Sequence, residues 1–395
     1  MKQKIIFFDI EGGHGGSSRS LFYTLSNLPL DKFEITVVCK RNSWMKRKYL
    51  KMGIECKIFQ EMPCFTALKG WHNNTMAFIY FIIITLPRFY SVRKKYIELI
   101  KKNDVVHLNQ ISLSFFGLWV RKLFPKKIIT MHIRTISYDN FFSWLNNFLS
   151  NKICKKFIFI TKRERDDMKQ ILKIKRINGK IITNPIPKWK ISLKKTNNKI
   201  NIASLSNYDS ERGTDRIIEV ASMIPRELRK YYIFHMIGDY KLNKILKNFF
   251  SQKNNLIDYS KQLGVREMFK FYGHKKFPEK ILSKCQYLIK LTKENNPWGR
   301  DIIESIYLRL GIIATGDQSP FIKNHFNGYL FKNYQAKKIA NCIGALSKNK
   351  KLITKHQYNS KILSDKLCDK KIISSQFESF WLSISKKSYK KKHSV

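Results

Sequence analysis

Residues 4–18 read KIIFFDIEGGHGGSS, a short apolar run followed at once by a glycine-rich turn. Apolar runs of four to five residues that do not alternate with polar ones indicate strands covered on both faces, as in a parallel sheet between two layers of helices. The run is therefore interpreted as a strand, the glycines as a turn and the next segment as a helix. This is the repeating unit of a doubly wound α/β fold.

The same pattern recurs in two series separated by a polar segment. Further strands are predicted at residues 35–39, 105–108, 128–131 and 157–160, and then at 200–205, 232–237, 269–272, 286–291 and 312–314. We therefore expect two Rossmann-like domains, a number that suits a chain of 395 residues. The predicted boundaries are 1–187 for the first domain, 188–199 for a Lys-rich linker, 200–370 for the second domain, and 371–395 for a C-terminal helix and basic tail. Two such domains would face each other across a cleft that binds the ligand.

The chain is strongly basic, since 76 Lys and Arg against 28 Asp and Glu give a formal net charge of +48. Such a charge attracts phosphorylated substrates, an anionic membrane surface or nucleic acid; the alternative is compositional drift on solvated faces. A nucleic-acid-binding protein is the weaker interpretation and no nucleic-acid partner is expected, because the basic residues are spread along the chain without zinc-finger spacing. The seven cysteines form no C-x-x-C pair, which predicts neither a disulfide framework nor a zinc site.

The N-terminal segment has no signal-peptide pattern, and the longest apolar run, residues 76–86, is shorter than the 18 or so residues of a membrane span. A cytoplasmic protein is therefore expected. A helix predicted over residues 74–102 places the apolar run beside several basic residues. This would suit a peripheral position on the anionic inner face of the cell membrane; the alternative is an ordinary core helix with a basic end.

Two turns that follow predicted strands could bind phosphate. In the turn of residues 12–16, glycines let the backbone approach an anion at the start of a helix, although the G-x-G-x-x-G fingerprint is not met. The alternative is a turn that binds no ligand. Arg212, next to Gly213, is predicted at the start of a helix in the second domain, where a cation suits a pyrophosphate.

A third turn precedes another helix, in residues 296–305 (NPWGRDIIES). Glu304 would lie one turn into that helix and could accept two hydrogen bonds from a ribose diol, while free N–H groups near Trp298 and Gly299 would face a bound sugar. The alternative is that Glu304 is only a favourable acid early in a helix. Separately, His132 is predicted at the end of a strand, where it could donate a hydrogen bond or carry a proton, or be structural.

Together and in this order, these segments resemble the family 4 glycosyltransferases of the GT-B fold, over nearly the whole chain. Gly15 and Gly16 match an early Gly-Gly turn that contacts the donor phosphates or the acceptor in that family. The segment DVVHLNQ, residues 104–110, is similar to its fourth strand, and His132 to its strand-end histidine near the reacting sugar.

In the second half, Arg212 and Gly213 stand where the family has a Lys-Gly pair that grips the pyrophosphate. Gly238, in GDY, is similar to the family's Gly-Asp-Gly, Gly273, in FYGH, to its glycine near the base, and residues 327–328 to its late Asn-Gly turn. Asn207 stands where many members have an arginine, which is one departure from the pattern.

The segment NPWGRDIIES resembles the family's paired-glutamate motif, in which two Glu residues are eight positions apart. Glu304 keeps the second, but Asn296 replaces the first, so an amide stands where a carboxylate beside the transferred sugar is expected. This departure implies either a different pattern of donor hydroxyls or reduced catalysis, and it leaves open a catalytically silent protein that binds a nucleotide sugar.

The resemblance implies a hexosyltransferase that moves a sugar from a nucleoside-diphosphate donor to a cell-surface glycan or lipid-linked acceptor, as in polysaccharide biosynthesis, with retention of configuration. It implies no metal and no cofactor, and the absence of an Asp-x-Asp pair agrees with that. The implied catalytic residues are His132 and Asn296. The implied donor-binding residues are Gly15, Gly16, Arg212, Gly238, Gly273, Trp298, Gly299 and Glu304.

Overall fold

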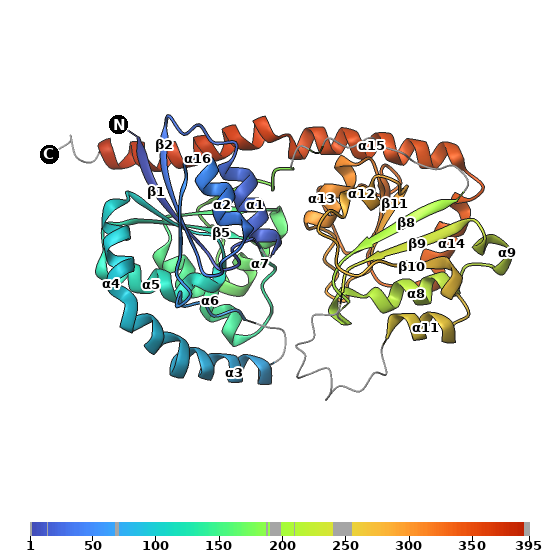
Figure 1. Ribbon diagram of the computed structural model, residues 1–395, viewed down its shortest axis with the longest axis horizontal. Coiled ribbons are helices and arrows are strands. Elements are labelled where there is room, and N and C mark those ends of the chain that lie inside the picture. Colours follow the sequence, from blue (N-terminus) through green and yellow to red (C-terminus); the bar gives the residue numbers. More distant parts are fainter. Residues whose placement is uncertain are drawn as a thin grey trace. The chain divides into compact units, whose positions relative to one another are not determined.

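The structure is a computed structural model that describes residues 2–13, 15–67, 71–186, 189, 199–208, 210–239 and 255–390. Most of the predicted linker 188–199, His14, Tyr240 and residues 391–395 lie outside these ranges. The chain divides into two compact units: unit 1 is Met1–Pro185 with Lys370–Val395, and unit 2 is Ile186–Asp369 (Figure 1). Each unit is described by itself below.

Unit 1 is a seven-stranded parallel sheet with helices on its faces, in the strand order β3-β2-β1-β4-β5-β6-β7. Its elements are β1 (Gln3–Asp9), α1 (Gly16–Leu25), β2 (Phe33–Cys39), α2 (Trp44–Lys51), β3 (Glu55–Ile58), α3 (Trp71–Tyr80), η1 (Phe81–Thr85), α4 (Leu86–Lys102), β4 (Val105–Leu108), η2 (Ile111–Leu113), α5 (Ser114–Leu123), β5 (Ile128–Ile133), α6 (Phe141–Ile153), β6 (Lys156–Phe159), α7 (Lys162–Leu172), β7 (Gly179–Ile181) and α16 (Lys370–Lys390). Ile5, Ile6, Phe7 and Phe8 are all fully buried, so both faces of β1 are covered as the sequence predicts.

The helix α16 belongs to unit 1 although it follows all of unit 2 in the sequence. Trp381 of α16 packs edge-on against Phe7 of β1 at 5.3 Å between ring centroids and is almost fully buried. Its ring also lies 5.6 Å from that of His107 in β4. The C-terminal helix therefore covers part of one face of the unit 1 sheet.

The helical stretch α3–η1–α4 is continuous from Trp71 to Lys102. Its middle segment, η1, is a π-helix, and the N–H of Leu86 donates to the carbonyl of Phe81. Pro87, which has no N–H to donate, stands directly after this turn in the first turn of α4, so the wider π turn carries the helix past the proline. The helix predicted over residues 74–102 is therefore present. Within the described residues, His72–Lys102 is long and apolar enough to cross a membrane by length and composition, contrary to the expectation that the apolar run is too short.

Unit 2 is a six-stranded parallel sheet in the order β10-β9-β8-β11-β12-β13. Its elements are β8 (Ile200–Leu205), η3 (Ser210–Arg212), α8 (Thr214–Ser222), α9 (Arg226–Arg229), β9 (Tyr232–Ile237), α11 (Leu256–Gln262), η4 (Arg266–Met268), β10 (Phe269–Phe271), α12 (Glu279–Leu282), β11 (Tyr287–Lys290), α13 (Arg300–Tyr307), β12 (Gly311–Thr315), β13 (Gly328–Phe331), α14 (Ala336–Leu346) and α15 (Lys350–Cys368). Both units thus have the predicted Rossmann-like α/β architecture.

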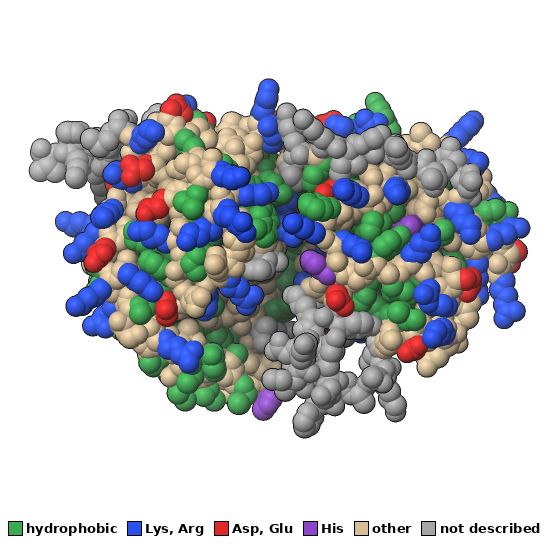
Figure 2. Space-filling model, viewed as in Figure 1, with side chains coloured by type: hydrophobic (Ala, Val, Ile, Leu, Met, Phe, Trp, Pro, Cys, Tyr) green, Lys and Arg blue, Asp and Glu red, His purple; other side chains and the backbone are tan. Residues whose placement is uncertain are grey.

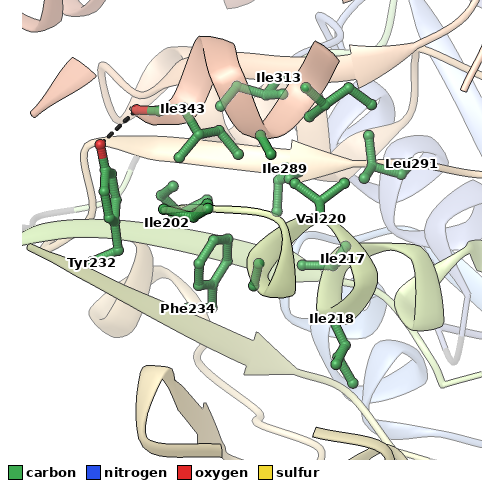
Figure 3. Close-up of a cluster of buried hydrophobic side chains, with 14 of the residues drawn as sticks. Ile202, Ile217, Ile218, Val220, Tyr232, Phe234, Ile289, Leu291, Ile313 and Ile343 are labelled. Carbon is green, nitrogen blue, oxygen red and sulfur yellow. Dashed lines mark hydrogen bonds between the residues drawn. The ribbon is translucent and has the colours of Figure 1, made fainter. Parts of the chain in front are cut away.

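The core of unit 2 forms where α8 and α14 pack on the sheet (Figure 3). Ile217 and Val220 of α8 and Ile343 of α14 are buried against strand residues such as Ile289. The hydroxyl of Tyr232 donates to the carbonyl of Ile343 at 2.6 Å, which satisfies the polar end of a fully buried ring. This packing fixes the start of α8, which follows the turn described next.

Candidate functional site

The strand order of unit 2 reverses between β8 and β11. From β8 the sheet continues through β9 to β10 on one side, and from β11 through β12 to β13 on the other. The strands are parallel, so their carboxyl ends lie along one edge, and folds of this kind bind ligands at that edge beside the reversal. The turns after β8 and β11 therefore form the candidate site of this unit.

The turn after β8 brings Arg212 to the start of α8. Gly213 is the N-cap of α8 with a φ of +63°, and no side chain caps the helix. A Cβ on Gly213 would lie 1.9 Å from the carbonyl oxygen of Leu291, so only glycine lets this turn pack against the one after β11. Arg212 is exposed to solvent. A cation beside the N–H groups of a helix start is suited to an anionic group such as a phosphate.

The turn after β11 is held by a lysine that is only 8% exposed, Lys290. Its Nζ lies 2.9 Å from Oδ2 of Asp301 and donates to the carbonyl of Trp298 at 2.7 Å. Burial lowers the pKa of Lys290, and the carboxylate of Asp301 opposes this shift. The pair joins the end of β11 to the first turn of α13, so it fixes the loop between them.

Asn296 lies in that loop, and its side chain shapes it. Oδ1 of Asn296 accepts a hydrogen bond from the N–H of Trp298 at 3.3 Å, and its own N–H donates to Oγ1 of Thr292 at 2.9 Å. The N–H of Trp298 is therefore not free, contrary to the expectation from the sequence, and the Trp298 side chain is buried. The amide Nδ2 of Asn296 donates to no residue in the described part of the chain, so it is available to a ligand.

Gly299 ends the loop as the N-cap of α13, with a φ of +144°. A Cβ there would lie 2.6 Å from Oδ1 of Asp301 and 3.0 Å from Nζ of Lys290. Glycine is thus required at this position both by the backbone conformation and by the ion pair beside it.

Glu304 lies one turn into α13, as predicted, and is nearly buried. Its Oε1 accepts from Arg300, at 2.6 Å from Nη2 and 3.0 Å from Nε. Among the described residues, Oε2 of Glu304 has no hydrogen-bond partner. Arg300 therefore holds the carboxylate in one orientation and leaves one oxygen for a ligand.

Gly238 and Gly273 follow β9 and β10 at the same edge of the sheet. The N–H of Gly238 donates to the carbonyl of Gly273 at 3.1 Å. A Cβ on Gly238, whose φ is +159°, would lie 1.8 Å from the carbonyl oxygen of Ser206, whereas a Cβ on Gly273 would meet nothing within 4 Å. The predicted donor-binding residues of this unit therefore share one edge, with Gly238 packed closely and Gly273 at an open turn.

In unit 1, the corresponding edge carries a hydrogen-bonded network around Asp9. This buried carboxylate accepts from the N–H of Gly12 at 2.9 Å, from Oγ of Ser18 at 2.6 Å and from Nδ2 of Asn109 at 2.9 Å. Burial raises the pKa of Asp9, and these hydrogen bonds act against that rise. The guanidinium of Arg134 joins the network, since its Nε donates to Oδ1 of Asn109 at 2.9 Å.

Gly15 and Gly16 lie at the start of α1, where Gly15 is an N-cap without a side-chain cap. A Cβ on Gly15 would lie 1.9 Å from a carboxylate oxygen of Glu11, and the same carboxylate accepts from Oγ of Ser17 at 2.5 Å. The start of this helix therefore already has an acidic side chain beside it. The corresponding turn of unit 2 differs in that basic residues accompany its acids: Arg212 follows Glu211, and Lys293 pairs with Asp215 of the first turn of α8 at 3.2 Å.

His132 is the last residue but one of β5, near the end of the strand as predicted, and its side chain is buried. Its ring centroid lies 6.0 Å from that of Phe377 in α16 and 6.2 Å from that of His107. Burial keeps the pKa of His132 well below its ordinary value, and the charge of Arg134 adds to this, so the imidazole is neutral. Its Nε2 has no hydrogen-bond partner among the described residues. A catalytic role for His132 stays a prediction.

Several residues of these networks are not among the predicted ones. Asp9 and Asn109 directly follow predicted strands, and this position was the available signal, whereas Arg134 comes three residues after the predicted strand 128–131. Lys290 is the residue in an otherwise apolar run, YLIKL, that would need a charged partner once buried. Because the chain has 76 basic residues, the residue type alone did not mark Lys290 as part of a site.

The comparison with family models matches residues 185–362 to the glycosyl transferases group 1. The matched segment covers most of unit 2, including Arg212, Gly238, Gly273 and the Asn296–Glu304 loop. No curated protein matches the chain by sequence.

Solved structures of similar fold cover both units. A crystal structure of Anabaena Alr3699/HepE in complex with UDP is 17% identical with a TM-score of 0.75, and the match covers 97% of this chain and 100% of that one. A glycosyltransferase from Rickettsia africae is 14% identical with a TM-score of 0.71, over 98% and 99% of the two chains. Sucrose-phosphate synthase from Thermosynechococcus elongatus is 12% identical with a TM-score of 0.73, over 97% and 99%. These matches confirm the predicted GT-B fold.

Proposed function

We propose that the protein is a glycosyltransferase that moves a sugar from a nucleoside-diphosphate donor, bound at the carboxyl edge of unit 2, to a glycan or lipid-linked acceptor. The observation that carries this proposal is the convergence of Arg212, Asn296 and Glu304 on the turns beside the strand reversal, within the segment matched to the glycosyl transferases group 1. The structure of Alr3699/HepE with UDP-glucose gives a precedent for such a donor in this fold.

The three residues have different proposed roles. Arg212, with the N–H groups at the start of α8, would neutralise the diphosphate that leaves with its electron pair. Glu304, oriented by Arg300, would accept hydrogen bonds from the ribose through Oε2. Asn296 would donate its amide N–H to a sugar hydroxyl, a role that a carboxylate at this position could not perform.

Gly238 and Gly273 would let the backbone lie close to the donor on the other side of the reversal. Because both backbone groups of Trp298 are already hydrogen-bonded, the backbone at Gly299, the N-cap of α13, would help to orient the sugar. Lys290 and Asp301 would act as positioning residues. None of these roles needs a metal ion, and no described group of three or more His, Cys, Asp or Glu side chains is arranged to hold one. Metal independence and retention of configuration are part of the proposal.

In unit 1, we assign Gly15 and Gly16 to the acceptor side. Glu11 supports this choice, because a carboxylate beside the start of α1 disfavours a second anion such as the donor phosphate and favours a hydroxyl that can donate to it. His132 would act from inside the unit through its neutral imidazole. The proposed acceptor is a cell-surface glycan or a lipid-linked molecule at the membrane. The proposed location is the cytoplasm or the periphery of the membrane.

A second candidate is a catalytically silent protein that binds a nucleotide sugar, and Asn296 is the observation that favours it. The two candidates share the donor site but differ in turnover.

A panel of UDP-, GDP-, ADP- and CMP-linked sugars tests both candidates, with thermal shift reporting binding and release of free nucleotide reporting transfer or hydrolysis. We expect one donor to stabilise the protein and to be consumed. Arg212→Ala and Glu304→Gln should each weaken donor binding by about tenfold, the effect of losing one charge-assisted hydrogen bond. Binding without turnover, for every acceptor tested, would favour the silent protein. No stabilisation by any donor, or unchanged binding in both variants, would refute the site.

A further inference from the structure

The helical stretch α3–η1–α4 exposes apolar side chains to an unusual extent. Six of its large apolar side chains are between 43% and 62% exposed: Tyr90 of α4 and, on α3 and η1, the five residues Met76, Ile79, Tyr80, Ile82 and Ile83. We call these five residues the apolar face. Hydrophobic side chains gather on the lower edge of unit 1 in Figure 2, over the position of α3 in Figure 1. Contiguous exposed apolar surface of this kind marks a contact with a partner or a membrane.

The exposed apolar surface continues onto α6. Phe78 of α3 and Phe142 of α6 lie 5.5 Å apart between ring centroids, so the two helices are neighbours there. Next to this contact, Phe141 and Trp144 are 51% and 37% exposed and stack on each other at 5.8 Å. Exposed aromatic rings are frequent where a protein meets the interface of a bilayer.

The charge of the exposed surface changes along the helix. Residues 72–87 contain no Lys, Arg, Asp or Glu, whereas the exposed residues of 88–102 include Arg88, Arg93, Lys94, Lys101 and Lys102 against one acid, Glu98. An apolar face continued by a basic one matches the acyl chains and the phosphates of an anionic bilayer, respectively. A protein partner would need to supply both an apolar surface and an acidic one in the same order.

The opposite side of the helix is fixed in the core of unit 1. Phe81, Phe89, Tyr96 and Ile100 are fully or almost fully buried, and the rings of Phe89 and Tyr96 lie 5.1 Å apart. Within the described residues, His72–Lys102 is long and apolar enough to cross a membrane, but crossing would remove these residues from the core. The helix is therefore placed to lie in the membrane surface and not to span it.

We propose that the apolar face, with Phe141 and Trp144, inserts into the interface of an anionic bilayer while the basic residues of α4 bind lipid phosphates. This proposal rests on the proposed function in one respect: the benefit of binding the bilayer would be to bring unit 1 to a lipid-linked or surface acceptor. Binding to the bilayer itself requires no donor.

The test is flotation of the full chain with vesicles of phosphatidylcholine alone or of phosphatidylcholine mixed with phosphatidylglycerol. We expect binding to the anionic vesicles that weakens with salt, and binding at least about tenfold weaker to the neutral ones. Ile79→Glu with Ile83→Glu should reduce binding by about tenfold or more. Arg93→Glu with Lys94→Glu should abolish the preference for the anionic lipid. Leu50→Glu, at an exposed leucine of α2 in the same unit, is the matched control and should bind as the unchanged protein does.

Thermal melting of each variant verifies that it is folded. Equal flotation of the control and of the Ile79→Glu, Ile83→Glu variant would overturn the proposal, as would equal binding to both kinds of vesicle. Resistance to carbonate extraction would show a spanning helix instead. Absence of vesicle binding, together with a dimer that the Ile79→Glu, Ile83→Glu variant dissociates, would assign the face to a second copy of the chain. Donor-induced stabilisation, measured on the same samples, separates failure of this surface from failure of the proposed function.

Discussion

The carboxyl edges of the two sheets occupy the same place in their folds but differ in charge. In unit 2, a buried ion pair between Lys290 and Asp301 fixes the loop, and Arg212 is exposed at a helix start. In unit 1, neutral donors hold the carboxylate of Asp9, and Glu11 lies beside the start of α1. The shared topology therefore gives a candidate site at each edge, and we expect the residues that follow each strand to decide whether an anion or a hydroxyl is favoured there.

The largest effect is expected from Lys290→Met, which leaves Asp301, whose side chain is only 14% exposed, without its partner. Breaking such a pair costs about 3–5 kcal/mol of stability, measurable by urea unfolding. Donor binding should fall as well, because the loop loses its tie to β11. Lys290→Met with Asp301→Leu removes both charges and should regain most of the stability. If the single variant is as stable as the unchanged protein, the ion pair does not hold this edge.

Gly213 and Gly273 allow a matched comparison within unit 2, since their φ values are +63° and +65° but only Gly213 has an atom in the way of a Cβ. Gly213→Ala should cost about 3–4 kcal/mol, from backbone strain together with overpacking against the carbonyl of Leu291. Gly273→Ala should cost about 1–2 kcal/mol, from the left-handed conformation alone. Equal losses in urea unfolding would mean that the two turns after β8 and β11 do not constrain each other.

The buried histidines make stability depend on pH. Burial lowers the pKa of His107 in unit 1 to about 3, and that of His356 in unit 2 to about 4. The unfolded chain, with a histidine pKa of about 6.5, binds the proton more readily below that value, so stability is full above pH 6.5 and falls as the pH drops towards the folded pKa. Between pH 7 and pH 5, the His107→Gln variant should therefore lose about 2 kcal/mol less stability than the unchanged protein does. His356→Gln should do the same for unit 2. An unchanged loss in both variants would contradict buried neutral imidazoles.

The smallest effect concerns Glu11, and it tests which ligand unit 1 receives. Suppose that the carboxylate of Glu11 receives a hydrogen bond from a hydroxyl of the sugar acceptor. Glu11→Gln should then raise the KM for that substrate about fivefold, because one hydrogen bond is weakened by about 1 kcal/mol. The KM for the nucleotide-sugar donor should not change. Initial rates with each substrate varied in turn give both values. A lower KM for the donor in the variant would instead place donor phosphate at the Gly15 turn.

The central strands could be predicted from the sequence because they are short, apolar and buried on both faces. Residues 105–108 and 200–205 match β4 and β8 residue for residue. β3, β7 and β13 were missed. β3, read as ECKI, alternates polar and apolar residues in a length of four, and β7 has only three residues, so neither has a period long enough to detect.

The candidate site could be predicted only where a residue type and its position were both unusual. Glu304 and Gly299 lie at the helix start that their motif predicts. The partners of these residues could not be predicted. The contact between Lys290 and Asp301 depends on the conformation of the loop between β11 and α13, and the burial of His132 under α16 depends on elements far apart in the sequence. Phe377 and Trp381 are separated from His132 by the whole of unit 2.

The return of α16 to unit 1 also sets the order in which the protein is completed during synthesis. The strands of unit 1 precede all of unit 2, but the face of its sheet around Phe7 and His107 stays without Trp381 until α16, which follows unit 2, has left the ribosome. Unit 2 is contiguous, so all of its strands are available before that helix is made. Of the two units, unit 1 is therefore completed after unit 2 although its strands are made earlier, and a nascent chain or one terminated before α16 would present an uncovered aromatic surface to chaperones.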